Sequence, residues 1–256
     1  MKDYKLEKKF YEFRDLRELL RTSAEKYPDK VAFVTKIKDK GTKEVNYINT
    51  TYANMFETME YLGTALIEKG YQDKRIAVIG ENSYHWCLSY FTAGCGVGVV
   101  VPLDKGLQKE ELESCLNRSN AEVIFYDKKQ AKVIEQIYKD QTTNLSLLIA
   151  MDFASQEGEN MMNLIDMGQK LVEKGDRRYL DAEIDPDALG FLLFTSGTTQ
   201  QSKAVMLSHR NFMSCNYGMN CEELFFPDDV NMMILPLHHC YGMSGLLTFL
   251  SQGMKN

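Results

Sequence analysis

Short apolar segments alternate with amphipathic segments through the middle of this 256-residue chain, and the alternation limits the folds it can adopt. Helical spacing is found between the apolar segments, for example in "LQKEELESCLNRS" (107–119). Strands that are apolar on nearly every residue must be buried on both faces. The sequence therefore predicts an α/β fold with a parallel sheet covered by helices on both faces. The expected strands are "RIAVIG" (75–80), "VGVVVPL" (97–103), "AEVIFYD" (121–127), "LSLLIAMD" (145–152) and "GFLLF" (190–194).

An N-terminal region precedes the alternation. Residues 14–26 have helical spacing and end at "YPD", so they are expected to form a helix. Its apolar face would consist of Leu16, Leu19, Leu20 and Ala24. "VAFVTKI" and "EVNYI" flank a turn that contains glycine, which predicts a β-hairpin. A second helix is expected over about 52–69, and a surface helix near 159–174.

The stretch "TSGTTQQSK" (195–203) follows the last apolar strand and combines hydroxyl side chains, one glycine and a closing lysine. Small residues let backbone N–H groups approach a phosphate, hydroxyls add donors, and a cation offsets the negative charge. An ordinary surface loop can have the same composition, and composition alone does not separate the two interpretations. Residues 204–207 are expected to form another strand, with Ser208 capping a helix that begins near His209.

The Walker A pattern of P-loop NTPases fails in this stretch. Ser202 stands where the pattern requires its second glycine, and Ala204 stands where a serine or threonine would hold Mg²⁺. The expected strand–loop–strand context also differs from the strand–loop–helix context of that motif. A P-loop NTPase is therefore disfavoured.

Composition and charge argue against several classes of protein. A formal net charge of −6 argues against nucleic acid as a partner. The opening "MKDYKLEKKF" lacks the apolar core of a signal peptide. The longest nearly apolar stretch, 88–103, is shorter than the roughly 18 residues of a spanning helix, and we expect a buried helix–turn–strand there. Six cysteines without CxxC spacing predict free thiols, no metal site and a cytoplasmic location.

The stretch "LLFTSGTTQQSKAVMLSHRN" resembles the pattern [YF]-T-S-G-T-T-G-x-P-K-G-V-x-L-S-H of the adenylate-forming enzymes, which include acyl-CoA synthetases. Gln200 and Ala204 replace glycines of that pattern, and Ser202 replaces its proline. The resemblance extends over nearly the whole chain, through 74–104, 116–127 and "ILPLHHCYGM" (234–243). In detail it is closer to the fatty acyl-CoA ligases than to amino-acid-activating domains.

The resemblance implies a two-step reaction. A carboxylate, expected to be a fatty acid, attacks the α-phosphate of ATP to give an acyl-adenylate and pyrophosphate, and coenzyme A then displaces AMP. The loop would hold the β- and γ-phosphates together with Mg²⁺, and no side chain is expected to ligate the metal directly. The loop residues expected to bind the nucleotide are Thr195, Ser196, Gly197, Thr198, Thr199 and Lys203.

The motif around His239 implies the acyl side of the site. His239 matches the family histidine near the acyl carboxylate, and His239 and Lys203 are the expected catalytic residues. Taken from the residues alone, the favoured interpretation of His239 is a helix-start or loop histidine with a structural hydrogen bond, and only the motif match reverses this preference. Two further sets were considered: Tyr241, Gly242, Met232, Met233 and Met243 near the acyl pocket or in the core, and Trp86, His85 and His209 in structural roles.

The resemblance also carries an expectation about extent. The chain is expected to be a partial N-terminal adenylation domain, with a first subdomain over about 1–180, the start of a second over about 181–256, and no C-terminal lid domain. The isolated fragment would then be inactive, and the alternative is a non-catalytic nucleotide-binding or oligomerising module. "SGLLTFLSQG" (244–253) is expected to form an exposed apolar patch that favours homo-oligomers. Contact with a membrane surface is left open.

Overall fold

A seven-stranded sheet forms the centre of the computed structural model, which describes residues 11–38, 44–155, 157–195, 202–223 and 225–256. Neighbouring strands run parallel except for the last pair, β8 and β9, which is antiparallel. All five expected strands are confirmed, as is the short strand expected at 204–207. In spatial order the strands are β7 (Glu159–Asn160), β6 (Leu147–Ala150), β5 (Val123–Tyr126), β3 (Lys74–Ile79), β4 (Gly98–Leu103), β8 (Leu189–Thr195) and β9 (Lys203–Ser208).

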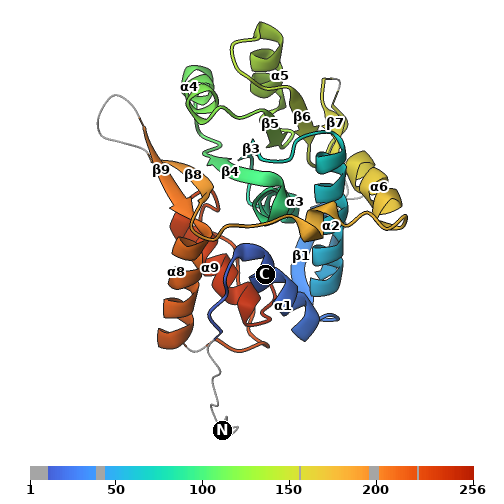
Figure 1. The fold of residues 1–256 in the computed structure, drawn as a ribbon, viewed down its shortest axis with the longest axis vertical. Helices are drawn as coiled ribbons and strands as arrows, with labels where there is room; N and C mark the ends of the chain where they lie inside the picture. Colours follow the sequence, from blue (N-terminus) through green and yellow to red (C-terminus); the bar gives the residue numbers. More distant parts are fainter. Residues whose placement is uncertain (1–10, 39–43, 156, 196–201, 224) are drawn as a thin grey trace, which may run out of the picture.

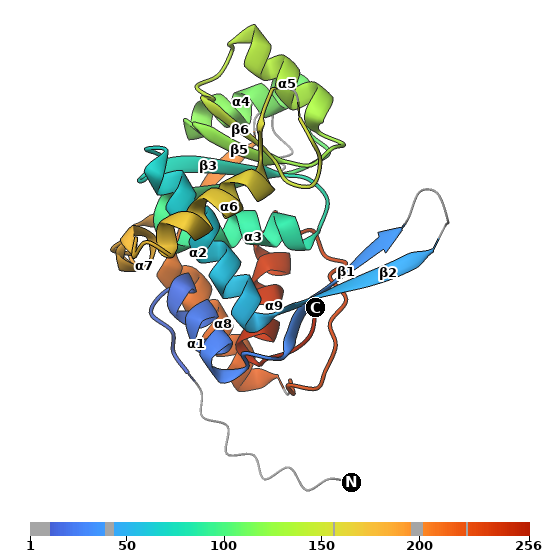
Figure 2. The same cartoon turned by 90° about the vertical axis from the view of Figure 1, so that its right-hand side faces the viewer.

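Helices cover both faces of the sheet, as predicted. Side chains along β3 alternate between two apolar cores: Ile76 and Val78 face one, and Ala77 and Ile79 face the other. Figure 2 shows α4 and α5 on one side of the sheet and α2, α3 and α6 on the other. The second core contains α4 (Lys109–Ser119) and α5 (Ala131–Asp140). The first contains α1 (Leu16–Lys26), α2 (Tyr52–Glu68), α3 (Tyr84–Thr92), α6 (Met161–Val172), α8 (His209–Glu222) and α9 (Cys240–Ser251).

The apolar stretch at 88–103 is a buried helix–turn–strand, as expected. Helix α3 passes through a short π-helix, η1 (Ala93–Val97), directly into β4. Trp86 on α3 is 1% exposed and stacks on Tyr90, which confirms its assignment to the core. No helix in the described part of the chain is both long enough and apolar enough to cross a bilayer.

The predicted hairpin is formed by β1 (Val31–Lys38) and β2 (Val45–Thr51). Its turn residues 39–43 lie outside the described residues. Asn256 pairs with the inner part of β1: its N–H donates to the carbonyl of Ala32 at 2.9 Å, and its carbonyl accepts from the N–H of Val34 at 2.8 Å. Figure 2 shows this end of the chain beside β1. The first and last described segments thus lie together.

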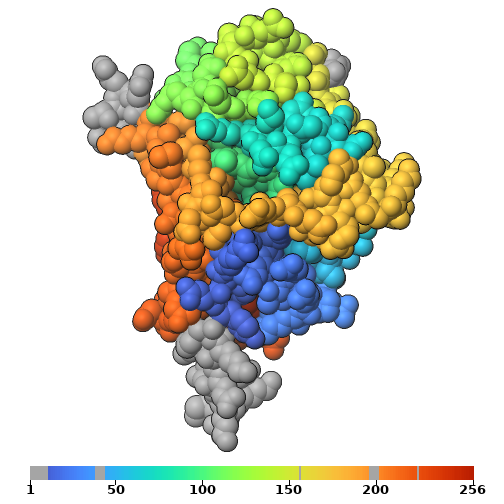
Figure 3. Space-filling model, viewed as in Figure 1, coloured from blue at the N-terminus to red at the C-terminus, as the bar shows by residue number. Residues whose placement is uncertain are grey.

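A strap at 182–188 links the short helix α7 (Arg178–Asp181) to β8 across the surface, between α1 and the sheet (Figures 1 and 3). Arg17 of α1 holds its beginning by donating to the carbonyls of Tyr179 at 2.9 Å and Ala182 at 2.6 Å. The subdomain boundary expected near residue 180 falls here. The sheet continues beyond it, because β8 pairs with β4 at Val100↔Phe191. The division into subdomains stays a prediction.

The exposed apolar patch expected at 244–253 is wrong. These residues form most of α9, and Leu246, Leu247 and Leu250 are at most 1% exposed. They belong to the same apolar core as α1 and α8, which supplies the packing partners. Exposed apolar side chains occur instead just before this helix, at Met232, Ile234 and Leu235, and in its first turn, at Tyr241.

His209 connects the first residue of α1 to the start of α8 and is structural, as expected. It is 4% exposed, and its Nδ1 accepts from the N–H of Leu16 at 3.2 Å. Its ring packs edge-on against the ring of Phe191, with the two centroids 4.9 Å apart. Burial lowers the pKa of His209 to about 4. The folded protein therefore holds this imidazole neutral at pH values where an unfolded chain would protonate it.

Acid should consequently weaken the fold through His209. The unfolded chain takes up a proton below about pH 6.5, whereas the folded chain resists until about pH 4. The free energy of unfolding should therefore fall by about 3 kcal/mol between these values from this residue alone. Urea unfolding measured at several pH values across that range tests this. His209→Asn keeps a hydrogen-bond acceptor but cannot titrate, so its free energy of unfolding should depend much less on pH. An equal pH dependence in the variant would contradict it.

Two helical glycines offer a matched test of packing. A Cβ at Gly168 of α6 would overlap the carbonyl oxygen of Tyr61 on α2, whereas one at Gly218 of α8 meets nothing within 4 Å. Gly168→Ala should lower the free energy of unfolding by about 1–3 kcal/mol because the two helices must separate. Gly218→Ala should be neutral or raise it by up to about 1 kcal/mol. Denaturant midpoints of the two variants decide the point, and equal midpoints would refute the close packing of α2 and α6.

Candidate functional site

The hydroxyl-rich stretch joins two antiparallel strands, as the sequence predicted. Thr195 ends β8 and Lys203 begins β9, and the two are register partners. The Thr195 hydroxyl lies 3.5 Å from the Lys203 carbonyl oxygen and donates to it. Both side chains are exposed. The structure therefore brings one predicted hydroxyl and the predicted cation together at the base of the loop. The other predicted loop residues, Ser196, Gly197, Thr198 and Thr199, lie outside the described residues.

The segment after the loop also follows the prediction. Ser208 caps α8, with its hydroxyl accepting from the N–H of Asn211 and the Asn211 side chain accepting from the N–H of Ser208. This reciprocal cap fixes where β9 ends and the helix begins.

His239 is the N-cap of α9 and is exposed. Its Nδ1 accepts from the N–H of Tyr241 at 3.3 Å, which is the helix-start arrangement considered from the sequence. This contact orients the ring without burying it. The proposed role beside an acyl carboxylate stays a prediction. Gly242 is needed here because a Cβ at that position would overlap the carbonyl oxygen of Pro236.

Asn82 fixes the segment that leads to His239. Its side-chain amide donates to the carbonyls of Met233 at 3.1 Å and Leu235 at 2.7 Å, and its Oδ1 accepts from the N–H of Leu237 at 3.2 Å. The neighbouring Ser83, not Asn82, caps α3 by accepting from the N–H of Trp86. Sequence reasoning did not foresee the clamp made by Asn82. Its position directly after a buried strand was the available indication.

Asp104 makes a second connection to the same segment. It follows β4, and its Oδ2 lies 3.6 Å from Nε2 of His238. Burial holds the pKa of His238 below its usual range, and Asp104 partly opposes this. β4, which ends just before Asp104, lies parallel to β8, which ends at Thr195.

The carboxyl ends of the parallel strands thus carry both parts of the candidate site. Glu81 follows β3 and forms ion pairs with Lys105 and Lys129, whose hydrogen bonds lower the pKa of Glu81. Its backbone N–H donates to Asp127, which follows β5. In open α/β sheets this edge is where ligands bind. The arrangement gathers Thr195, at the base of the hydroxyl-rich stretch, and the histidine segment, residues 233–239, at one edge.

An apolar cavity of about 270 Å³ lies beside the histidine segment. Met232, Met233, Tyr241 and Gly242, all expected near an acyl pocket, line it, whereas Met243 is buried in the core. The remaining walls come from α8, α9 and residues 225–237. Its walls suit an apolar chain, and its lining includes Tyr241, two residues after His239.

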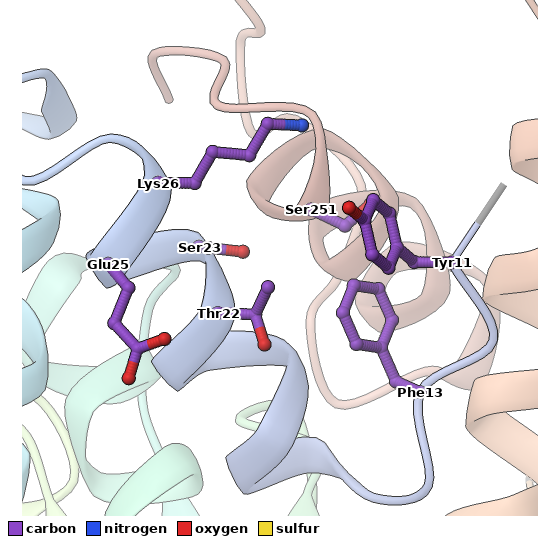
Figure 4. A pocket seen from close by; sticks show the side chains of 7 residues that line it. All are labelled: Tyr11, Phe13, Thr22, Ser23, Glu25, Lys26 and Ser251. Atoms are coloured by element: carbon purple, nitrogen blue, oxygen red, sulfur yellow. The ribbon is translucent and has the colours of Figure 1, made fainter. Parts of the chain in front are cut away.

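A second cavity, of about 260 Å³, lies away from the predicted residues. Figure 4 shows it between the segment before α1, α1 itself and Ser251. The rings of Tyr11 and Phe13 stack with centroids 6.2 Å apart, and Nζ of Lys26 lies 5.7 Å from the Tyr11 centroid. None of the site residues predicted from the sequence lines it, so it forms no part of the candidate site.

Comparison with known proteins agrees with the predicted α/β fold. Residues 20–256 match the family model described as AMP-binding enzyme. The chain therefore belongs to the AMP-binding enzyme family.

Two curated relatives and one solved structure illustrate the match. The chain is 30% identical over 208 residues to long-chain-fatty-acid–CoA ligase 5 of Rattus norvegicus, covering 75% of this chain and 30% of the relative. It is 27% identical over 228 residues to human long-chain-fatty-acid–CoA ligase 1, covering 80% of this chain and 31% of the relative. A long-chain-fatty-acid-CoA ligase from Archaeoglobus fulgidus has the same fold, with a TM-score of 0.78 at 16% identity, covering 96% of this chain and 47% of that one. The chain thus spans about 30% of the length of these curated relatives.

The clamp made by Asn82 predicts a local effect. Asn82→Ala removes three hydrogen bonds to residues 233–237, together worth about 3 kcal/mol, so the Leu237 amide should exchange with solvent roughly 100-fold faster. Hydrogen exchange resolved by residue measures this. Asn144→Ala, which removes an exposed side-chain hydrogen bond to Asn120, is the matched control and should leave Leu237 unchanged. Unaltered exchange at Leu237 in Asn82→Ala would contradict the clamp.

Proposed function

We propose that the protein containing this chain is an ATP-dependent acid–thiol ligase that activates a long-chain fatty acid as its acyl-adenylate and transfers the acyl group to coenzyme A. Membership in the AMP-binding enzyme family supports an enzyme that uses ATP. The names of the relatives support a fatty acid and coenzyme A as the other substrates. The single structural observation that carries the proposal is the pairing of Thr195 with Lys203 at the carboxyl edge of the sheet.

The proposed chemistry depends on position and charge. Attack of a carboxylate on the α-phosphate of ATP brings two anions together, so it needs cations and hydrogen-bond donors that are fixed in advance. Lys203 would offset charge on the β- and γ-phosphates as pyrophosphate leaves, and the Thr195 hydroxyl would donate to a phosphate oxygen. Mg²⁺ would arrive with ATP and take its ligands from the phosphates. The loop residues 196–199 would complete the cradle.

The histidine segment would receive the acid. The exposed ring of His239 would lie beside the carboxylate, and the adjacent cavity lined by Met233 and Tyr241 would take part of the acyl chain. Asn82 and Asp104 would keep this segment against the same sheet edge as Thr195. Peripheral membrane contact and self-association are compatible with the exposed apolar side chains at Met232 and Ile234.

Lys203→Ala tests the proposal. Loss of the ammonium group should slow fatty-acid-dependent exchange of pyrophosphate into ATP by about 10- to 1000-fold, because charge on the leaving pyrophosphate is no longer offset. Lys203→Arg should slow this exchange less. Lys170→Ala, on the exposed surface of α6, should exchange pyrophosphate at the wild-type rate. Normal exchange by Lys203→Ala would remove the role of this lysine. Absence of any fatty-acid-dependent exchange in the wild type would favour a non-catalytic module.

A further inference from the structure

One arginine contacts a residue at the end of β8 and the residue just before β9, on either side of the loop that joins these strands. Nη1 of Arg118, on α4, donates to the carbonyl oxygen of Ser202 at 2.7 Å and lies 3.4 Å from its hydroxyl. The guanidinium carbon of Arg118 also lies 5.3 Å from the ring centroid of Phe194. Phe194 is the last residue but one of β8, and Ser202 immediately precedes β9. We propose that Arg118 is a positioning residue that clamps these two residues and thereby fixes where Lys203 presents its ammonium group.

The helix end that carries Arg118 is itself held in place. Arg75 of β3 donates to the carbonyl of Ser119 at 2.7 Å, which connects the end of α4 to the centre of the sheet. Cys115, one turn before Arg118, is 2% exposed, and its Sγ lies 3.9 Å from the Ser202 hydroxyl. Ser202 is therefore held against α4 by two side chains on the same helix face. The clamp transmits the position of α4 to the start of β9.

An arginine suits this position better than a lysine. A planar guanidinium can stack on an aromatic ring while its N–H groups donate in the plane, whereas an ammonium group cannot do both. Within the described part of the chain, the guanidinium of Arg118 forms an ion pair with no carboxylate. Its contacts with Ser202 and Phe194 therefore account for its orientation.

β9 needs such an anchor because it is the edge strand of the sheet. Its residues Ala204, Val205 and Met206 are exposed, and Met206 reaches 71%. Little side-chain packing therefore restrains the first part of this strand, residues 203–206, apart from its pairing with β8. Ser202 also stands where the adenylate-forming pattern has a proline that would stiffen the chain. The hydrogen bond from Arg118 on α4 restrains Ser202, whereas a proline at this position would restrain the backbone covalently.

The inference rests on the proposed function of Lys203, and the kinetic test uses the protein that contains this chain. Arg118→Ala should lower kcat/KM for ATP by about 10- to 100-fold in fatty-acid-dependent pyrophosphate exchange, because the cation is displaced from the phosphates. KM for the fatty acid should stay unchanged. Arg118→Lys keeps the charge but not the clamp, so it should recover only a small part of the lost kcat/KM for ATP. Arg177→Ala, which removes an exposed arginine on the strap side, is the control and should match the wild type.

A second measurement does not depend on catalysis. In Arg118→Ala the backbone amides of Lys203–Val205 should exchange with solvent about tenfold faster, while Tm changes by no more than about 2 °C, since Arg118 is exposed. Full activity in Arg118→Lys would assign the effect to charge alone and overturn the inference. The inference would also be overturned if Arg118→Ala had normal kinetics and unchanged hydrogen exchange at the Lys203–Val205 amides. If the wild type shows no exchange of pyrophosphate, the proposed function fails, and the amide measurement still decides whether Arg118 is the clamp.

Discussion

Burial of the central strands on both faces is the constraint on which the rest of the structure depends. Ile76 and Val78 of β3 face one core, while Ala77 and Ile79 face the other. Strands of this kind leave no room for polar side chains along their length, so polar groups collect where the strands end. The sheet edge that results carries Asn82, Asp104 and Thr195 within one region, and it is rigid because the strands beneath it are packed from both sides.

Each polar residue at this edge fixes a different neighbouring segment or side chain. Asn82 hydrogen-bonds to the backbone of the histidine segment, and Asp104 faces His238. Glu81 holds two lysines, and Asp127 accepts from two backbone N–H groups. Parts of the site that are far apart in the sequence are therefore placed by neighbouring strands.

Local patterns predicted most of the fold and only part of the site. The strands and the longer helices follow from apolar spacing, and the Ser208 cap follows from residue type, because these depend on near neighbours in the chain. The two-residue strand β7, the four-residue helix α7 and helix α9 were not predicted. α9 is apolar around much of its circumference, so it was mistaken for an exposed patch. The contacts of Asn82 with Leu237 and of Arg118 with Ser202 join residues 155 and 84 positions apart, and no local pattern reveals such pairs.

The pairing of Asn256 with β1 has a consequence for the order in which the protein is made. β1 and β2 are close in sequence and can pair soon after they leave the ribosome, but Ala32 waits for a partner 224 residues later. Until then the inner edge of the hairpin has unpaired backbone groups, and Tyr52 lacks the Met254 carbonyl to which its hydroxyl donates. Closing so distant a contact comes late in folding. Pairing along the inner edge of β1 is therefore completed only after the residues around Asn256 have been synthesised.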